Sequence, residues 1–393
     1  MKPHILLCLA AASATLLQVP AAAQTTAPAR NESLKQEIQL AYARGLAFLK
    51  SKQNAQTGQW GEAEPVAFTG LALSSAMLDP ARKPGDPISP ELEKGYQFLL
   101  KSVQPDGGIY VQARANYNTS LALVALMLNP KLENEQVALR ARRFVIGQQN
   151  DFDEKGKTDN PFDGGIGYGT PKAGKPAHAD MSNTTFALEA LHYSAGLLAD
   201  KGDAAKDEPK LNFSAAIEFI QRCQNRPESN PASWVSKDAK DYGGFVYAPG
   251  ETRGQEVKTP DGRVALRSYG SISYAGLMSF IYAGLDANDP RVKAVIEWLS
   301  ANFTLDENPG LGAEGKFYYY HTMAKALSAA NLDLLKLKDG KVIDWRAELG
   351  KKLLNIQAGD GSWKNEAGRW MESDDILVTS YTLLALARIH QGL

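Results

Sequence analysis

The chain has 393 residues, of which 44% are hydrophobic and 22% are charged, a balance typical of globular proteins with a large buried core. Its 43 lysine and arginine residues nearly match its 44 aspartate and glutamate residues, so the formal net charge is -1. Without surplus positive charge, the chain has no long-range attraction for nucleic acid or for an anionic membrane surface. Neither is expected as a partner.

The first 23 residues follow the three-part plan of a secretory signal peptide. A basic start precedes an apolar run from Ile5 to Leu17, and small residues precede Gln24. The run is shorter than the roughly 20 residues that span a bilayer, which disfavours a membrane anchor. We therefore expect cleavage after Ala23, a secreted or periplasmic protein with no stable membrane span, and a flexible N-terminal segment over residues 24–33.

Cysteine is scarce in the expected mature chain. After removal of the signal peptide, Cys223 is its only cysteine. The mature protein can therefore form no intrachain disulfide and no zinc site that needs a cysteine pair. Its stability must come from packing.

A pattern that occurs six times runs along the rest of the chain. Each copy has an amphipathic segment that ends near a glutamine, a glycine-rich turn with an aromatic residue, and a second segment rich in small apolar residues. Paired glycines allow the positive φ angles of a tight reversal, and the aromatic residue can pack over the joint. The aromatic residues expected at equivalent turn positions are Trp60, Tyr110, Tyr168, Phe245 and Trp363.

The second segments of five copies align on a pattern close to T-x-x-A-L-x-A-L. They start at Thr69, Thr119, Thr184, Ser273 and Thr379. Threonine and serine favour the N-cap of a helix, so these residues are expected to start the helices. The second segments are apolar nearly all round whereas the first segments keep a charged face, which predicts second helices inside and first helices outside.

Six such pairs predict an all-α fold, the α/α toroid, which is a double ring of about six helical hairpins around a central cavity. An open superhelix is the alternative, and closure is favoured because the terminal copies lack the polar face of a capping repeat. A single toroid domain is expected over residues 34–393. Polar stretches at about 150–180 and 226–267 are expected as loop insertions.

The repeats, as in GLAFLKSKQNAQTGQWG and LLNIQAGDGSW, resemble those of the prenyltransferase and squalene oxidase repeat superfamily. This is the α/α toroid of squalene cyclases and of the β subunits of protein prenyltransferases, and the resemblance covers about Leu34 to His390. Squalene cyclases carry Asp-x-Asp-Asp-Thr at the start of an inner helix, where a protonated acid starts cyclisation. The matching stretch here, Asp180 to Thr184, keeps one of the three carboxylates, so a terpenoid cyclase with a degenerate acidic motif stays an alternative.

Protein prenyltransferases bind zinc through an Asp-x-Cys pair and a distant histidine. His321 in YYYHT resembles the histidine segment, but the sequence has no Asp-x-Cys, so we expect neither zinc nor another cofactor. A second acidic candidate is ESDD, which contains Asp374, although carboxylates there are also favoured by the start of a helix.

The starts of the inner helices are expected to surround a cavity mouth that holds the functional residues, because buried helix starts offer unpaired backbone N–H groups and the insertions can cover them. The candidate catalytic residues are Asp180, His321 and Asp374. The candidate ligand-binding residues are His178, Asn183, Arg267, Tyr269, Tyr274, Tyr320, Asp375 and Tyr381.

Three functions fit these observations, and they leave open whether the protein is an enzyme. The first is a toroid that binds an unknown ligand, or a protein partner, in or over its central cavity. The second is a terpenoid cyclase or prenyltransferase-type enzyme. The third is a periplasmic polysaccharide-active (lyase-like) enzyme, with Tyr or His as acid and base and with Arg or Asn to neutralise a uronate. An apolar tunnel would favour an isoprenoid, a polar groove a sugar, and a filled centre a scaffold.

Overall fold

The computed structural model describes residues 31–393 except 84, 130, 132–133 and 170–177. The expected signal peptide and its cleavage site lie outside these residues, as does most of the expected N-terminal segment. Within the described chain, no helix is long and apolar enough to cross a membrane.

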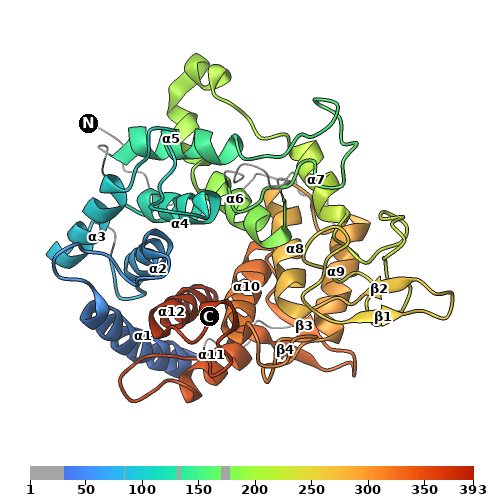
Figure 1. Ribbon diagram of the computed structural model, residues 1–393. Coiled ribbons are helices and arrows are strands. Elements are labelled where there is room, and N and C mark those ends of the chain that lie inside the picture. The colour runs from blue at the N-terminus through green and yellow to red at the C-terminus, as the bar shows by residue number, and fades with distance from the viewer. Residues whose placement is uncertain (1–30, 84, 130, 132–133, 170–177) are drawn as a thin grey trace, which may run out of the picture.

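Six helices of the described residues form a closed inner ring. Each packs against the next along the chain, and the last packs against the first, so the chain returns to its start. In Figure 1 the earliest helix of the chain, in blue, lies beside the last two, in red. The prediction of a closed α/α toroid is confirmed. The inner helices are α2 (Pro65–Met77), α4 (Ala115–Met127), α6 (Met181–Tyr193), α8 (Gly270–Tyr282), α10 (Lys316–Ala329) and α12 (Asp375–Gly392).

An outer helix precedes each inner helix and covers the ring from outside (Figure 1). Each outer helix buries one face and exposes the other to solvent. In the helix over Pro90–Lys101, for example, the buried face consists of Gly95, Tyr96 and Leu99. They are α1 (Glu32–Lys52), α3 (Pro90–Lys101), α5 (Glu135–Ile146), α7 (Phe213–Gln221), α9 (Pro290–Ala301) and α11 (Trp345–Asn355).

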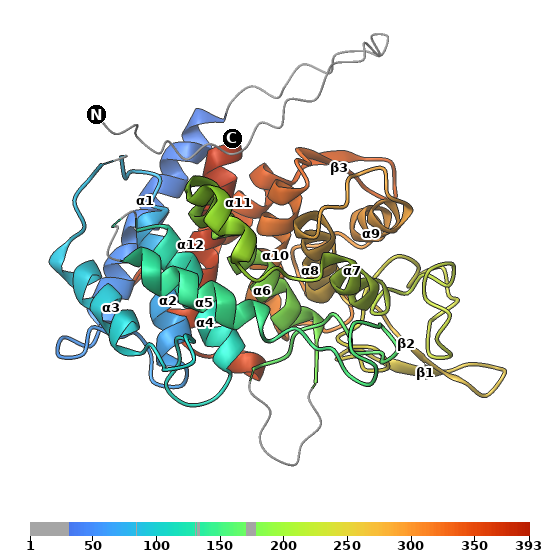
Figure 2. The ribbon, with the colours of Figure 1, turned by 90° about the horizontal axis from the view of Figure 1, so that it is seen from above.

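Short elements join or decorate these helices. The 3-10 segment η2 (Ala195–Asp207) follows α6. A second one, η3 (Arg369–Met371), precedes α12. Two antiparallel hairpins pair β1 (Glu256–Lys258) with β2 (Val264–Leu266), and β3 (Leu334–Lys336) with β4 (Val342–Asp344). The β1–β2 hairpin belongs to the second expected insertion and projects from the edge of the ring (Figure 2).

A backbone hydrogen bond recurs where the turn meets the inner helix. In five repeats the N–H of a turn residue donates to a Thr or Ser hydroxyl that lies three or four residues inside the helix. The aligned hydroxyls therefore anchor the turns, and their expected N-cap role is wrong. Ile109 and Ile166 occupy the positions expected for Tyr110 and Tyr168. The pairs are Trp60 with Thr69, Ile109 with Thr119, Ile166 with Thr184, Phe245 with Ser273, and Trp363 with Thr379, at 2.9 to 3.0 Å.

Glutamines at the ends of outer helices tie neighbouring repeats together. Gln53 Nε2 donates to the carbonyl of Gly58 in its own turn and to that of Glu91 in the next outer helix. Gln357, in the last repeat, makes the same pair of bonds to Gly361 and to Ala41 in α1. The last repeat is thus joined to the first by the contact that joins consecutive repeats.

Candidate functional site

The inner helices all start at one face of the ring, which we call the mouth. Residues at neighbouring starts contact each other: the Asn118 side chain accepts a hydrogen bond from the N–H of Ala67, and Asn116 donates to the carbonyl of Asn183. Across the ring, the hydroxyls of Ser182 and Tyr318 lie 3.0 Å apart. The mouth therefore brings together residues from distant parts of the sequence.

Backbone N–H groups at these helix starts donate hydrogen bonds to side chains of the protein. The expectation that buried helix starts would offer unpaired N–H groups is wrong at these positions, so a ligand at the mouth must be contacted mainly by side chains. The acceptors are Asn118 for Ala67, Asp180 for Asn183, Asn308 for Ser271, Glu372 for Phe317 and Tyr318, and Asp374 for Ile376 and Leu377.

Three of the predicted site residues lie together at the start of α6. Asp180 is fully buried and accepts hydrogen bonds from the backbone N–H and the side-chain amide of Asn183, at 2.9 and 2.8 Å. His178 Nδ1 lies 3.9 Å from Asp180 Oδ2, and the His178 ring stacks on Tyr247 with the centroids 6.1 Å apart. Burial raises the pKa of the Asp180 carboxyl, and the hydrogen bonds from Asn183 oppose this shift.

Two other predicted residues lie in an aromatic cluster at the ring axis. His321 on α10 and Tyr381 on α12 stack with their ring centroids 4.8 Å apart. His321 is buried, and neither of its ring nitrogens has a hydrogen-bond partner among the described residues. Burial lowers the pKa of His321, and the nearby charge of Lys325 lowers it further. Tyr318 packs against both Tyr381 and Phe186, which extends this axial cluster to α6.

Side chains meet across the axis at several depths. Ser182 on α6 contacts Tyr318 on α10, and Glu189 forms an ion pair with Lys325 seven residues further along both helices, which is two helical turns deeper. Arg388 on α12 donates a hydrogen bond to the hydroxyl of Tyr193 at the end of α6. Protein side chains therefore occupy the centre of the ring at these levels.

The remaining predicted residues lie apart from these two groups. Tyr269 is buried before α8, and Tyr274 is buried against Tyr319 with the centroids 5.6 Å apart. The Tyr320 hydroxyl donates to the carbonyl of Leu305 at 2.5 Å. Asp375 forms an ion pair with Lys52 of α1 at 3.1 Å.

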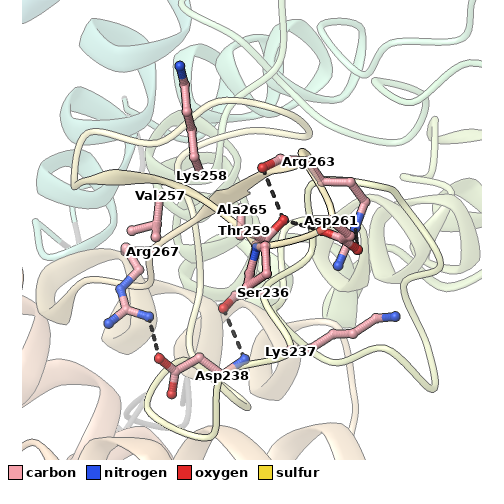
Figure 3. Close-up of a pocket in the computed structure, with 11 residues that line it drawn as sticks. Ser236, Lys237, Asp238, Val257, Lys258, Thr259, Asp261, Arg263, Ala265 and Arg267 are labelled. Atoms are coloured by element: carbon pink, nitrogen blue, oxygen red, sulfur yellow. Dashed lines mark hydrogen bonds and ion pairs between the residues drawn. The ribbon is translucent and has the colours of Figure 1, made fainter.

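Arg267 lines a separate pocket beneath the β1–β2 hairpin, with a volume of about 510 Å³ (Figure 3). Its guanidinium donates to Asp238 and Asp241 at 2.9 and 2.7 Å. Arg263 is similarly paired with Asp261 at 2.7 Å. Because aspartates already neutralise both arginines, neither is set up as a free cation for a uronate.

Glu189 and Lys325 were not among the predicted site residues, and Glu372 was noted only as the first residue of ESDD. The first two had a visible signal, since each is a charged residue within an otherwise apolar inner helix, in TTFALEAL and HTMAKAL. Glu372 is buried and caps α10 from the segment before α12. Among the described residues, no group of three or more His, Cys, Asp or Glu side chains could hold a metal ion.

No family model matches the chain, and no curated protein matches its sequence. Its fold is similar to that of the type II terpene cyclase MstE from Scytonema, solved with the substrate geranylgeranyl dihydroxybenzoate. The TM-score is 0.53 at 12% identity, over 92% of this chain and 100% of that one. It is also similar to the GH76 α-mannanase BT2949 from Bacteroides thetaiotaomicron, with a TM-score of 0.51 at 12% identity, over 89% of this chain and 95% of that one. At this identity the likeness shows the α/α toroid fold alone.

Proposed function

We propose that this protein is an exported toroid that binds a ligand over the mouth of its ring rather than inside the ring. The observation that carries the proposal is the set of cross-ring contacts, above all the buried ion pair between Glu189 and Lys325. A ligand threaded along the axis would have to separate these buried charges, which is costly. The side chains at the mouth need no such rearrangement.

The same observation disfavours a terpenoid cyclase. An isoprenoid chain needs an enclosed apolar cavity, whereas the axis here holds the Glu189–Lys325 pair and the buried Arg388 guanidinium. Asp180 also stands without the two further carboxylates of the cyclase motif.

A polysaccharide-active enzyme is the second candidate. It is favoured by His178, which is partly exposed above the buried Asp180 and also lies 3.2 Å from Glu251. A histidine held between two carboxylates can act as a general base or acid towards a ligand at the mouth. The proposal therefore leaves room for catalysis at the same place.

Export and ancestry are part of the proposal. Export is supported by the three-part pattern of the first 23 residues. Membership of the prenyltransferase and squalene oxidase repeat superfamily is supported by the glutamine and turn contacts that recur from repeat to repeat.

Hydrogen exchange with defined probes tests where a ligand binds. The probes are cellohexaose, mannohexaose, xylohexaose, tetragalacturonate and geranylgeraniol. Any probe that binds should protect amides near the starts of inner helices, such as those of residues 113–118, 178–184 and 314–318. Protection centred on the second halves of α6 and α10, around Glu189 and Lys325, would place the ligand inside the ring and overturn the proposal.

A further inference from the structure

We propose that the mouth binds a neutral oligosaccharide, an inference that rests on the proposed binding at the mouth. The inference is based on three clusters of side chains that are built in the same way. In each, an arginine lies over an aromatic ring and also forms an ion pair with a glutamate. The clusters are Tyr168 with Arg114 and Glu64, Tyr247 with Arg253 and Glu251, and Trp370 with Arg369 and Glu314.

The contacts are close in all three clusters. The guanidinium carbon lies 5.5, 4.1 and 4.3 Å from the ring centroids of Tyr168, Tyr247 and Trp370, respectively. The corresponding ion pairs, of Arg114, Arg253 and Arg369, measure 2.8, 2.7 and 2.5 Å.

The location of the clusters follows from their neighbours. Arg114 directly precedes α4, and the carbonyl of Tyr168 accepts a hydrogen bond from the α4 residue Asn116. The carbonyl of Tyr247 accepts from Met181, the first residue of α6. A Cβ atom added to Gly315, just before α10, would lie 3.1 Å from the Trp370 ring. All three clusters therefore stand at the mouth.

Their charge selects the class of ligand. Each arginine is neutralised by its glutamate, so a cluster offers N–H donors and carboxylate acceptors without net charge. Sugar hydroxyls both donate and accept hydrogen bonds and match this arrangement, whereas a polyanion would need unpaired cations. The exposed rings of Tyr168 and Trp370 add a flat apolar surface on which a sugar ring can lie, whereas Tyr247 is buried and only supports its arginine.

Two of the three aromatic rings are exposed to solvent, although an exposed aromatic ring does not stabilise the folded state. Tyr168 is 43% exposed and Trp370 is 41% exposed. The backbone at Trp370 and at Arg114 has a φ of 55°, a left-handed conformation that is strained for residues other than glycine. Strain that holds an exposed aromatic ring in place indicates a binding role.

The exposed rings stand at two different inner helices, from which we infer a chain of sugars rather than a single one. Tyr168 stands at α4 and Trp370 at α10, and these helices lie opposite each other in the six-membered inner ring. With neighbouring helix axes about 8 to 10 Å apart, opposite helices in a regular ring are about 16 to 20 Å apart. A ligand that reaches both of these helices must be extended, as an oligosaccharide is.

Isothermal titration of the mature protein with cellohexaose, mannohexaose and xylohexaose tests the inference. At least one should bind at millimolar or lower concentration, and Trp370→Gly or Tyr168→Ala should each weaken it about tenfold. Trp370→Gly also relieves the left-handed backbone, so its Tm should be unchanged or higher. Phe213→Ala is the matched control, because Phe213 is 43% exposed but lies at the start of the outer helix α7, and its affinity should equal that of the wild type.

The outcomes separate the inference from the proposed function. If tetragalacturonate or geranylgeraniol binds at the mouth while no neutral hexasaccharide does, the oligosaccharide inference is wrong and binding at the mouth stands. If a hexasaccharide binds wild type, Trp370→Gly and Tyr168→Ala equally, the three clusters are not its binding site. If hydrogen exchange then shows protection away from the mouth, the proposed function is wrong as well. If no hexasaccharide binds at millimolar concentration, the inference fails. A Trp370→Tyr variant should keep most of the affinity, because it keeps an aromatic face.

Discussion

Lys325 on α10 and Glu189 on α6 form a buried ion pair across the interior of the ring, although α8 stands between these helices in the ring. Both side chains are more than nine-tenths buried, so each depends on the other to offset the loss of its hydration. The pair therefore holds two helices that are not neighbours at a fixed separation. It is also the contact that most directly excludes a threaded ligand.

Breaking this pair should strongly destabilise the protein. Lys325→Met leaves the Glu189 carboxylate buried without its partner, which costs about 3 to 5 kcal/mol in comparable cases. The double variant Lys325→Met with Glu189→Leu removes both charges of the pair and should recover part of that loss, but not all of it, because Glu189 also attracts the buried Arg388 guanidinium. Urea unfolding at neutral pH measures both values. A single variant as stable as the wild type would show that the pair is solvated and that the axis is open to water.

Closure of the ring should depend on Gly361. Its φ is +91°, and a Cβ atom there would lie 2.5 Å from the carbonyl oxygen of Arg44 in α1. Gly361→Ala should therefore lower the free energy of unfolding by about 1 to 3 kcal/mol from backbone strain alone, with the clash added. Gly359→Ala is the control, because Gly359 has no positive φ and no atom within 4 Å of an added Cβ. Equal stability of the two variants would argue against tight packing between the last and first repeats.

Much of this architecture could be predicted because the repeats are local. Each turn and its helices lie within about one repeat, and six copies report the same pattern. The role of Thr69 and its equivalents was misjudged because the helices begin three or four residues earlier in the chain. Asp180 and Asp374 are local N-caps of α6 and α12. Other helix starts are capped across repeats, as Asn118 caps Ala67 over 51 positions.

Part of the candidate site could likewise be predicted from the sequence, and part could not. His178, Asp180 and Asn183 are close in sequence, and their grouping at one helix start could be expected. The cluster of Tyr168 with Arg114 could not, because these residues lie in different repeats and meet only when the ring forms. Trp370 gave no periodic signal, since it stands in an irregular segment with a left-handed backbone.

His321 should make stability depend on pH on the acid side. Its folded-state pKa is lowered from the ordinary 6.5 by burial and by Lys325, so the unfolded chain takes up the proton first. Stability should consequently fall as the pH drops below about 6.5. His321→Phe keeps an aromatic ring against Tyr381 and removes this loss, so its Tm relative to wild type should stay level from pH 8 to about pH 6.5 and then rise towards pH 5. A constant Tm difference over that range would show that His321 does not contribute to the acid loss.

Asp180 should act in the opposite sense. Burial raises its folded-state pKa above the ordinary 3.8, so the native state holds the proton more tightly than the unfolded chain. Its contribution to stability is therefore greatest at low pH and is lost as the pH rises through the raised pKa. Asp180→Asn keeps an oxygen that can accept from the N–H of Asn183 but cannot ionise, so its stability relative to wild type should increase from about pH 4 to pH 7.

Asp180→Ala provides the control for this experiment, because it removes the cap together with the charge. It should be less stable than Asp180→Asn at every pH, by about 1 kcal/mol for the lost N-cap. Chemical unfolding of all three proteins at several pH values between about 4 and 7 measures the differences. If Asp180→Asn instead loses stability relative to wild type as the pH rises, the ionised carboxylate stabilises the start of α6. In that case the attraction between its charge and the helix N-terminus outweighs the cost of burying it.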